Sequence, residues 1–368
     1  MPRRIRIGVI FGGRSGEHDV SLRSAEAVMN AVDPDRFEVV PIGIARDGRW
    51  ITGGDPLHRL ADASQLPLAL PRPQDQYDDV SVTQHEENVT LDVGSSYWAR
   101  DVDVLFPVLH GPWGEDGTVQ GLLELANVPY VGAGVMASAL AMDKITSKQL
   151  FERAGLPQAP WTWVLRRDWQ REPDAVLERV EREIGYPCFV KPANLGSSVG
   201  ISKVHHAGEF ADAFNEAAHH DRKIVIEKGL DARELEVSVL GNDDPVTSVV
   251  GEIVPCNEFY DFNAKYVDGD SQLLIPAPIT PEQSEKVRDI AVKAFKIIDG
   301  AGMARADFFV ERPTGDVFLN EVNTIPGFTQ TSMYPLLWEA SGLPFRDLVT
   351  RLVELAVERH GERQGWPG

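Results

Sequence analysis

Hydrophobic residues fall into continuous runs in the first third of the chain. Residues 5–11, 37–45 and 102–109 are almost wholly apolar, a pattern typical of parallel strands that are buried on both faces. A glycine-rich turn follows the first run and leads into residues 21–28, where the apolar positions follow a helical period. Strand, glycine-rich turn and helix open a nucleotide-fold βαβ unit, so the sequence predicts an N-terminal α/β domain.

The pattern changes near Gly134, and we predict the first domain boundary there, so that residues 1–134 form the first domain. Beyond it, short apolar runs and amphipathic helical stretches follow one another without a regular βαβ order. Strands are predicted at residues 184–191, 201–204, 224–228 and 234–240, and helices at residues 144–154, 281–298 and 343–360.

The composition excludes several classes of protein. The chain has 368 residues, 43% of them hydrophobic, and a formal net charge of −20 without a long basic tract, so binding to nucleic acid or an anionic membrane is not expected. Cys188 and Cys256 are the only cysteines, which argues against a disulfide framework or zinc cluster and fits a reducing compartment. The most apolar long window, residues 128–142, is shorter than the roughly 20 residues of a membrane span.

A hairpin near the C-terminus carries the clearest candidate chemistry. Two β-rich runs, residues 305–311 and 317–323, flank a turn that contains proline and glycine. If the hairpin is symmetric about Thr314, Asp307 faces Glu321, Arg305 faces Asn323, and all four side chains leave the same face. Opposed like charges destabilise a hairpin, so we expect a cation between the carboxylates, and oxygen ligands favour Mg²⁺ or Mn²⁺. The alternatives are a solvated charged face, or a one-residue bulge that breaks the pairing.

Lysines and small residues suggest an anion site. Lys144 lies at the start of a helix and Lys191 at the end of an apolar strand, before the loop 194–200, which is rich in glycine and serine. Such a loop lets backbone N–H groups approach phosphate oxygens, although a flexible hairpin tip has the same composition. Its order of strand, loop and strand differs from that of a P-loop, and a dinucleotide fingerprint fails because Phe11 stands where the first glycine belongs.

Three other features complete the candidate site. Glu17 follows the first glycine-rich turn and could point into a cleft, although an acid is also favoured at a helix start by the dipole. His110 ends a predicted strand, where ligands bind in α/β sheets, but a structural histidine is an equal alternative. Residues 256–276 are polar, rich in aromatic residues and without a period, as in a lid.

With these motifs in place, the chain resembles the D-alanine–D-alanine ligases of the ATP-grasp superfamily. The resemblance runs from residues 11–13 through 191–200 to 320–327, which covers nearly the whole length. It implies an N-terminal α/β domain, a small central domain (residues 135–228) and a C-terminal α+β domain (residues 229–368) with the lid at 256–276. It also implies a cytoplasmic homodimer that makes D-alanyl-D-alanine for peptidoglycan from ATP and D-alanine, without nucleic-acid or membrane partners.

The resemblance also assigns site residues. Those that act on the two amino acids, or in a triad that ties the lid down, would be Glu17, Ser197, Tyr266, Arg305, Gly327 and Ser332. Those that hold ATP would be Lys144, Lys191, Ser197, Ser198, Glu227, Lys228, Leu230, Glu234, Lys265, Phe309, Asn320 and Glu321. Two Mg²⁺ (or Mn²⁺) ions would be held by Asp307, Glu321 and Asn323. Lys265 would also help Ser332 to bind the carboxylate of the second D-alanine.

Two other functions remain open at this point. A ligase that joins D-alanine to D-lactate would carry most of the same motifs, but Tyr266 in the lid favours the enzymes that use an amine. A non-catalytic nucleotide-binding protein could share the scaffold, but the complete set of acidic and basic residues argues against it. The preference for D over L amino acids follows from the resemblance alone.

Overall fold

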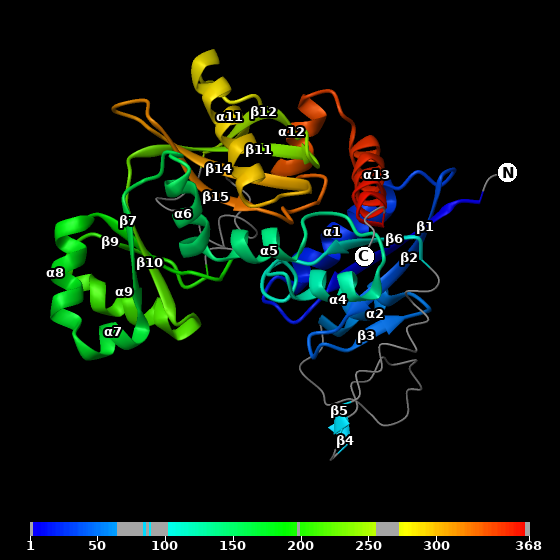
Figure 1. Cartoon of the computed structure of the whole chain (residues 1–368), viewed down its shortest axis with the longest axis horizontal. Coiled ribbons are helices and arrows are strands. Elements are labelled where there is room, and N and C mark those ends of the chain that lie inside the picture. Colours follow the sequence, from blue (N-terminus) through cyan, green and yellow to red (C-terminus); the bar gives the residue numbers. More distant parts are fainter. Residues whose placement is uncertain are drawn as a thin grey trace.

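The structure is a computed structural model, and it describes residues 3–64, 84–85, 88–89, 102–196, 199–254 and 272–364. Figure 1 shows three bodies around a common centre: the N-terminal strands in blue, a central part in green, and a C-terminal part in yellow to red. Each body is built on its own larger sheet. No helix of the described residues is both long and apolar enough to cross a membrane.

The N-terminal sheet has the strand order β3-β2-β1-β6. Strands β1 (Ile5–Gly12), β2 (Phe37–Ile44) and β6 (Val104–Val108) run parallel, as the continuous apolar runs predicted, and β3 (Trp50–Thr52) pairs antiparallel with β2. The helices of this part are α1 (His18–Ala31), α2 (Pro56–Ser64) and α4 (Thr118–Ala126). Beyond β6, a single parallel bridge joins Leu105 to Tyr130. Two short strands, β4 (Gln84–His85) and β5 (Asn88–Val89), pair with each other.

The central sheet is antiparallel, in the order β7-β10-β8-β9. Its strands are β7 (Trp161–Leu165), β8 (Cys188–Pro192), β9 (Ser202–Val204) and β10 (Lys223–Lys228). Helices α8 (Pro173–Glu183) and α9 (Ala207–His220) bury Val180, Phe210 and Phe214 against one face, and the short α7 (Arg166–Arg171) precedes them. The opposite face is left for other parts of the chain.

The C-terminal sheet follows the order β13-β12-β11-β14-β15, and its strands are β11 (Ala232–Gly241), β12 (Val246–Val254), β13 (Gln272–Leu274), β14 (Gly302–Glu311) and β15 (Val317–Asn323). Helix α11 (Pro281–Ile297) covers one face, where alternate residues of β11 and β14, such as Val237 and Phe308, form the core. Because side chains alternate along a strand, the intervening polar residues of β11 and β14 lie on the other face.

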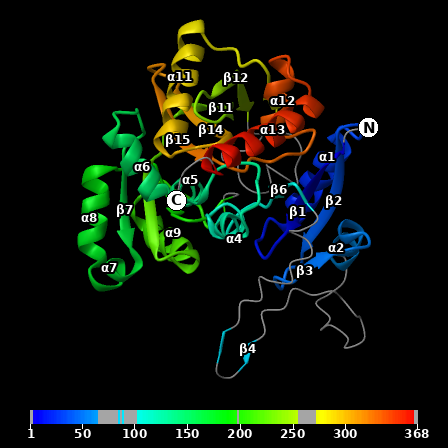
Figure 2. The ribbon, with the colours of Figure 1, turned by 45° about the vertical axis from the view of Figure 1, so that its right-hand side comes forward.

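Three helices connect the bodies. Helix α5 (Val135–Met142) and α6 (Lys144–Arg153) place Ala137 and Phe151 in the core of the C-terminal sheet, while α13 (Phe345–Gln364) packs into the core of the N-terminal sheet. Helix α12 (Met333–Ala340) packs on β11 and β12. Figures 1 and 2 show α13 beside α1 and β6 in both views. The division at residues 134 and 228 stays a prediction.

The β14–β15 hairpin has the pairing expected at its functional end but not at its turn. Arg305 pairs with Asn323 and Asp307 with Glu321, whereas Phe308 pairs with Leu319. The symmetric register about Thr314 is therefore wrong near the turn, and a bulge at Asn320 restores it further along. The bulge also explains why Leu319 and Val322, three positions apart, both face the core.

Candidate active site

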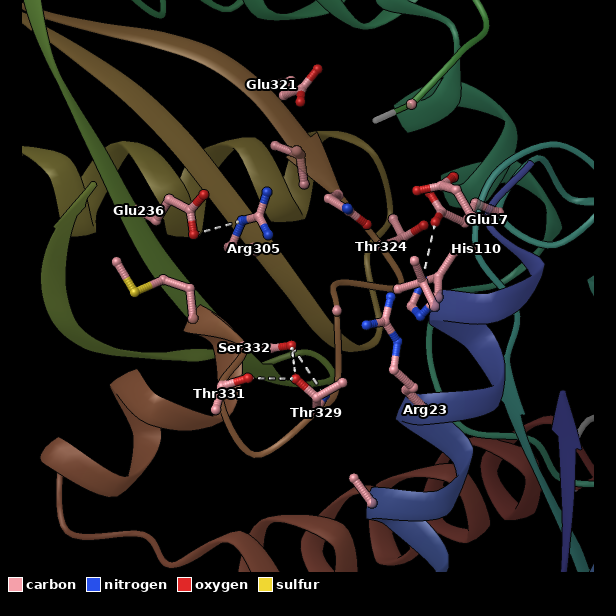
Figure 3. A pocket seen from close by; sticks show the side chains of 18 of the residues that line it. Glu17, Arg23, His110, Glu236, Arg305, Glu321, Thr324, Thr329, Thr331 and Ser332 are labelled. Carbon is pink, nitrogen blue, oxygen red and sulfur yellow. Dashed lines mark hydrogen bonds and ion pairs between the residues drawn. The ribbon is translucent and has the colours of Figure 1, made fainter. Parts of the chain in front are cut away.

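A cavity of about 640 Å³ lies where the three bodies meet. Figure 3 shows that its labelled side chains come from α1, from the loop after β6, from β11, β14 and β15, and from the loop before α12. Seven of the residues that the resemblance assigns line it: Glu17, Lys144, Arg305, Glu321, Asn323, Gly327 and Ser332. Segments more than 300 positions apart thus contribute to one cavity.

Glu17 is positioned by the turn after β1. That turn requires glycine at position 12 for two reasons. Gly12 has φ +92°, and a Cβ there would lie 2.2 Å from the carbonyl oxygen of Ile44. The Glu17 carboxylate lies beside two more glycines: its Oε2 would be 2.6 Å from a Cβ at Gly111 and 3.4 Å from one at Gly196. Glu17 therefore reaches from the N-terminal body to the loop that precedes Ser197.

His110 lies on the wall of the cavity and is buried. Its Nδ1 is 3.1 Å from the carbonyl oxygen of Ile325 and its Nε2 is 3.2 Å from the Ser24 hydroxyl, so Nδ1 donates and Nε2 accepts in the neutral ring. Burial opposes the charged form, but Glu115, at 3.6 Å, and Glu17 outweigh it and raise the pKa of His110. The histidine ties the first sheet to the segment after β15.

Three carboxylates stand in a row across the polar face of the C-terminal sheet. Glu236 of β11 pairs with Asp307 of β14, which pairs with Glu321 of β15. In the next row Arg305 donates two hydrogen bonds of 2.7 Å to Asp307, and its Nε lies 3.1 Å from Glu236. The sequence analysis placed Asp307 opposite Glu321 but did not include Glu236 in the site. The sequence of β11 alone does not show that Glu236 pairs with Asp307 of β14.

Arg305 is a fixed cation at the floor of the cavity. Burial disfavours its charge, but Asp307, Glu236 and Glu321 outweigh that effect and raise the pKa of the guanidinium further. Its side chain keeps 17% exposure on the cavity side. A planar cation with that exposure can donate to an oxyanion in the cavity while two carboxylates hold its orientation.

The oxygens of Asp307, Glu321 and Asn323 suit a hard divalent cation, since all three are carboxylate or amide oxygens on neighbouring positions of one hairpin face. Asn323 Oδ1 also accepts from the backbone N–H of Ile325 at 3.0 Å, which fixes the amide. Among the described residues, no three acidic, histidine or cysteine side chains converge on one point. Three protein oxygens would leave coordination positions of Mg²⁺ open for water or for the oxygens of a ligand.

The loop before α12 brings Gly327 against Ser332. A Cβ at Gly327 would lie 3.1 Å from the Ser332 hydroxyl, so a larger residue would crowd it. Ser332 Oγ accepts from the backbone N–H of Thr329 at 3.0 Å and lies 2.7 Å from the Thr329 hydroxyl. Figure 3 shows both hydroxyls side by side on the cavity wall, opposite Arg305.

Lys144 connects the central loop to the row of carboxylates. Its ammonium donates to the carbonyl oxygen of Leu195 at 2.7 Å and lies 3.5 Å from Glu321. The helix that carries it begins at a cap, where the Asp143 side chain accepts from the backbone N–H groups of Ile145 and Thr146. The cap fixes the first turn of α6 and hence the place of Lys144.

A second charged group lies between α6 and the central sheet. Lys191 donates to Glu227 at 2.9 Å, and the Lys148 ammonium lies 3.4 Å from the other carboxylate oxygen. All three residues are buried. Sequence reasoning had proposed Lys191 and Glu227 but missed Lys148, whose only signal was its place one helical turn after Lys144.

The remaining expected residues lie apart from the cavity wall. The Lys228 ammonium donates to the carbonyl oxygen of Tyr186 at 2.8 Å, and Leu230 follows it in the connection from the central to the C-terminal sheet. Glu234 pairs with Phe309, and Asn320 is the bulge residue. Ser197, Ser198, Lys265 and Tyr266 lie outside the described residues, as do residues 256–271 of the expected lid. Residues 272–274, at the end of the expected lid, form strand β13.

Comparison with known proteins agrees with this geometry. Residues 6–133 match the family described as D-ala D-ala ligase N-terminus, and residues 150–354 match D-ala D-ala ligase C-terminus. The chain belongs to the D-alanine–D-alanine ligase family. Both matched regions contribute residues to the cavity. The chain has the ATP-grasp fold of this family, as the resemblance implied.

Relatives of the family are similar over almost the whole chain. The D-alanine–D-alanine ligase of Geobacillus kaustophilus (strain HTA426) is 51% identical over 361 residues, which is 98% of this chain and 97% of the relative. That of Heliobacterium modesticaldum (strain ATCC 51547 / Ice1) is 51% identical over 361 residues, 97% of this chain and 96% of the relative.

Solved structures of the family share the arrangement of the three bodies. The D-alanine-D-alanine ligase from Coxiella burnetii superposes with a TM-score of 0.79 at 34% identity and covers 98% of this chain and 96% of its own. The VanG D-Ala:D-Ser ligase from Enterococcus faecalis superposes with a TM-score of 0.79 at 33% identity, over 96% of this chain and 100% of its own.

Proposed function

We propose that this protein is an ATP-dependent ligase that joins two D-alanines into D-alanyl-D-alanine for peptidoglycan synthesis. The observation that carries the proposal is the single cavity that gathers Glu17, Arg305, Glu321, Gly327 and Ser332 from parts of the chain that are distant in sequence. The relatives with this name cover nearly the whole chain. Phosphorylation of one carboxylate by ATP, attack by the second amine and loss of phosphate would complete the reaction.

The first D-alanine would be held at both ends. Its ammonium needs an anion, which Glu17 supplies at the rim of the cavity. Its carboxylate becomes an acyl phosphate and then a tetrahedral oxyanion, which needs donors aimed at it. Arg305 and the backbone N–H of Gly327 line the same cavity and would serve as those donors. The orientation of Arg305 by Asp307 and Glu236 removes the reorganisation that a free side chain would require.

Two lysines would bind the oxygens of the phosphoryl group that is transferred. Lys144, at the cavity edge, and Lys191, in the buried group beside it, are the cations that the proposal assigns to phosphate oxygens. Asp307, Glu321 and Asn323 would hold two divalent ions. Bound there, such ions neutralise charge on the phosphate oxygens. The chain's own part is to orient those oxygens and to keep water away.

The adenine and ribose would lie near the connection between the central and C-terminal sheets. We assign the base edge to Glu227, Lys228 and Leu230 and the ribose to Glu234. Phe309, Asn320 and the loop with Ser197 and Ser198 would complete the nucleotide site. The buried carboxylate of Glu227 is suited to accept from an exocyclic amino group.

The second D-alanine would bind against the loop before α12. Ser332 and Lys265 would hold its carboxylate, and a triad of Tyr266, Ser197 and Glu17 would tie the lid to the other domains. The contact of Glu17 with Gly196 supports this triad, since it brings the carboxylate next to the residue before Ser197. The lid would keep the acyl phosphate from water.

We further propose a homodimer that acts in the cytoplasm, where ATP is available. Light scattering coupled to size exclusion tests the dimer, and a mass of one chain, 40.6 kDa, would contradict it.

The test of the function is an amino-acid panel with ATP and Mg²⁺, scored for phosphate release and for product mass. We expect D-alanyl-D-alanine as the main product from D-alanine alone. D-serine and D-lactate are included as second substrates, since a relative named for D-serine shares the fold. An ester or a D-Ala-D-Ser product in excess would change the assigned substrate, and absence of phosphate release with every amino acid would reject the ligase.

A further inference from the structure

A buried lysine that the proposed function does not use stands beside the nucleotide residues. Lys148 is 2% exposed, and its helix α6 lies between the central and C-terminal sheets (Figure 1). Burying an ammonium group away from water is unfavourable by several kcal/mol unless other groups compensate it. Its presence there therefore calls for a reason.

Packing fixes Lys148 against the polar end of the central sheet. Ile145, one turn earlier on α6, packs with Ala193 and Val225 in a small apolar cluster on the face opposite α8 and α9. Val225 pairs with Lys191 across β10 and β8, and Glu227 is two positions further along the same face. The three charged groups are thus placed by strand register and by the seat of one helix, and not by flexible loops.

The two oxygens of Glu227 have different partners. Oε2 accepts a hydrogen bond of 2.9 Å from Lys191. Oε1 accepts no hydrogen bond from the described residues and lies 3.4 Å from the Lys148 ammonium. An oxygen that is buried and held at ion-pair distance can still accept a hydrogen bond from a ligand.

The group has two cations for one carboxylate. Burial would raise the pKa of Glu227, but Lys148 and Lys191 outweigh it and lower the pKa to about 2, so the carboxylate stays ionised. Burial disfavours both ammonium groups, yet Glu227 raises the pKa of Lys191, while the pKa of Lys148 stays lowered by burial and by the charge of Lys191. Glu227 is shared between the two lysines, and Lys191, at 2.9 Å, is the closer partner, with Lys148 at 3.4 Å.

From this arrangement we propose that Lys148 is a positioning residue that holds Glu227 toward the base of the nucleotide while Lys191 turns to the phosphates. This inference rests on the proposed function, which assigns Lys191 to phosphate oxygens and Glu227 to the base edge. If Lys148 were absent, Lys191 would have to neutralise Glu227 and bind phosphate at once. The second lysine separates these two tasks.

The division of tasks predicts an effect on base choice. An ionised carboxylate accepts from the 6-amino group of adenine and repels the 6-oxo group of hypoxanthine. A positioned Glu227 should therefore favour ADP over IDP, which carries the same phosphates. Loss of Lys148 should weaken the binding of ADP more than that of IDP. Both nucleotides would lose part of their phosphate contact with Lys191, because Lys191 must then also neutralise Glu227. Only ADP would also lose a positioned hydrogen-bond acceptor for its base.

The experiment is calorimetric titration of the full-length protein with ADP and with IDP, at fixed Mg²⁺. For Lys148→Met we expect ADP to bind about tenfold more weakly, the size of one hydrogen bond to a charged group, and IDP no more than about threefold. Lys286→Met, on the exposed side of α11, is the matched control and should change neither affinity.

A double variant keeps the test informative if the single one does not fold. In Lys148→Met/Glu227→Gln, Lys191 no longer faces a carboxylate, so the affinity for IDP should recover to the wild-type value. The affinity for ADP should stay low, because the carboxylate acceptor for its 6-amino group is gone. The two affinities should therefore become nearly equal. Equal losses of ADP and IDP in Lys148→Met, without recovery in the double variant, would make Lys148 a packing residue and overturn the proposal, as would unchanged affinities. Failure of the proposed function is a different result: the wild-type protein itself would bind neither nucleotide.

Discussion

The protein buries two charged groups near its centre, and their balance is opposite. On the C-terminal sheet, Arg305 contacts both Asp307 and Glu236, so among the described residues of this group one cation meets two carboxylates. On the central sheet, Glu227 lies between Lys148 and Lys191, so one carboxylate meets two cations. Neighbouring strands hold the acidic group, whereas two neighbouring strands and helix α6 together hold the basic group.

The difference indicates what each group is built to meet. A site with excess negative charge attracts divalent cations, and a site with excess positive charge attracts phosphates. Lys144 connects the two bodies that carry these groups, because its ammonium donates to Leu195 of the central body and lies 3.5 Å from Glu321 of the C-terminal one.

The largest expected effect comes from the acidic group. Glu321→Gln removes a charge without changing the side chain's shape, and we expect turnover to fall by about 10³ or more while the thermal unfolding temperature changes little. Phosphate release with ATP and D-alanine measures it, with circular dichroism as the check on folding. Near-normal turnover at ordinary Mg²⁺ would mean that the row of carboxylates is not a cation site.

Arg305 should show the next largest effect. We expect Arg305→Lys to lower turnover by roughly 10²–10³, the usual loss for one oxyanion donor, since an ammonium cannot reproduce two parallel bonds to Asp307 while also facing the cavity. The same phosphate assay measures it. Full activity of the lysine variant would reduce Arg305 to a partner that only neutralises Asp307 and Glu236.

The basic group can be tested through stability and pH. The folded-state pKa of Glu227 is about 2, below its ordinary value of 4.5. The ionised carboxylate therefore stabilises the folded protein at neutral pH, and this stabilisation is lost as the pH falls from 4.5 toward 2. Glu227→Gln should therefore be less stable than wild type at pH 7, and the difference should shrink by about 2 kcal/mol at pH 3. Urea unfolding followed by circular dichroism gives both values. A difference that is independent of pH would contradict the ion pairing.

The smallest effect is expected at Asn323. Its amide is neutral and already accepts from the N–H of Ile325, so Asn323→Ala should raise the Mg²⁺ concentration for half-maximal activity by only about three- to tenfold. A Mg²⁺ titration of the activity measures this. A loss as severe as that of Glu321→Gln would place the amide, and not the carboxylates, at the centre of the metal site.

The sequence predicted the hairpin well because the relevant information is local. Strand alternation and a turn marked by proline and glycine were enough to oppose Asp307 to Glu321. The bulge at Asn320 was not predictable, since the extra residue is chosen by packing on both sides of the strand and carries no residue signature. The predicted symmetric pairing was right at one end only because the bulge offsets the turn.

The pattern of hydrophobic and polar residues did not predict the contacts between distant parts of the chain. Lys148 sits on a helix where a lysine usually faces water, and only the packing of α6 on two sheets buries it. Glu236 had an unremarkable place on its strand until β14 lay beside it. The position of Glu17 beside Gly196 likewise depends on how the N-terminal and central bodies pack together, which a local sequence pattern does not predict.

The C-terminal helix has a consequence for how the protein is made. Leu348, Leu352 and Val353 of α13 complete the core around Phe106, and Arg359 donates to the carbonyl oxygens of Gly132 and Tyr130. A ribosome finishes β6 long before it begins α13, an interval on the order of tens of seconds at about 5–20 residues per second. The first sheet to be synthesised is thus among the last to be covered, and its apolar face stays without this cover until α13 has been made.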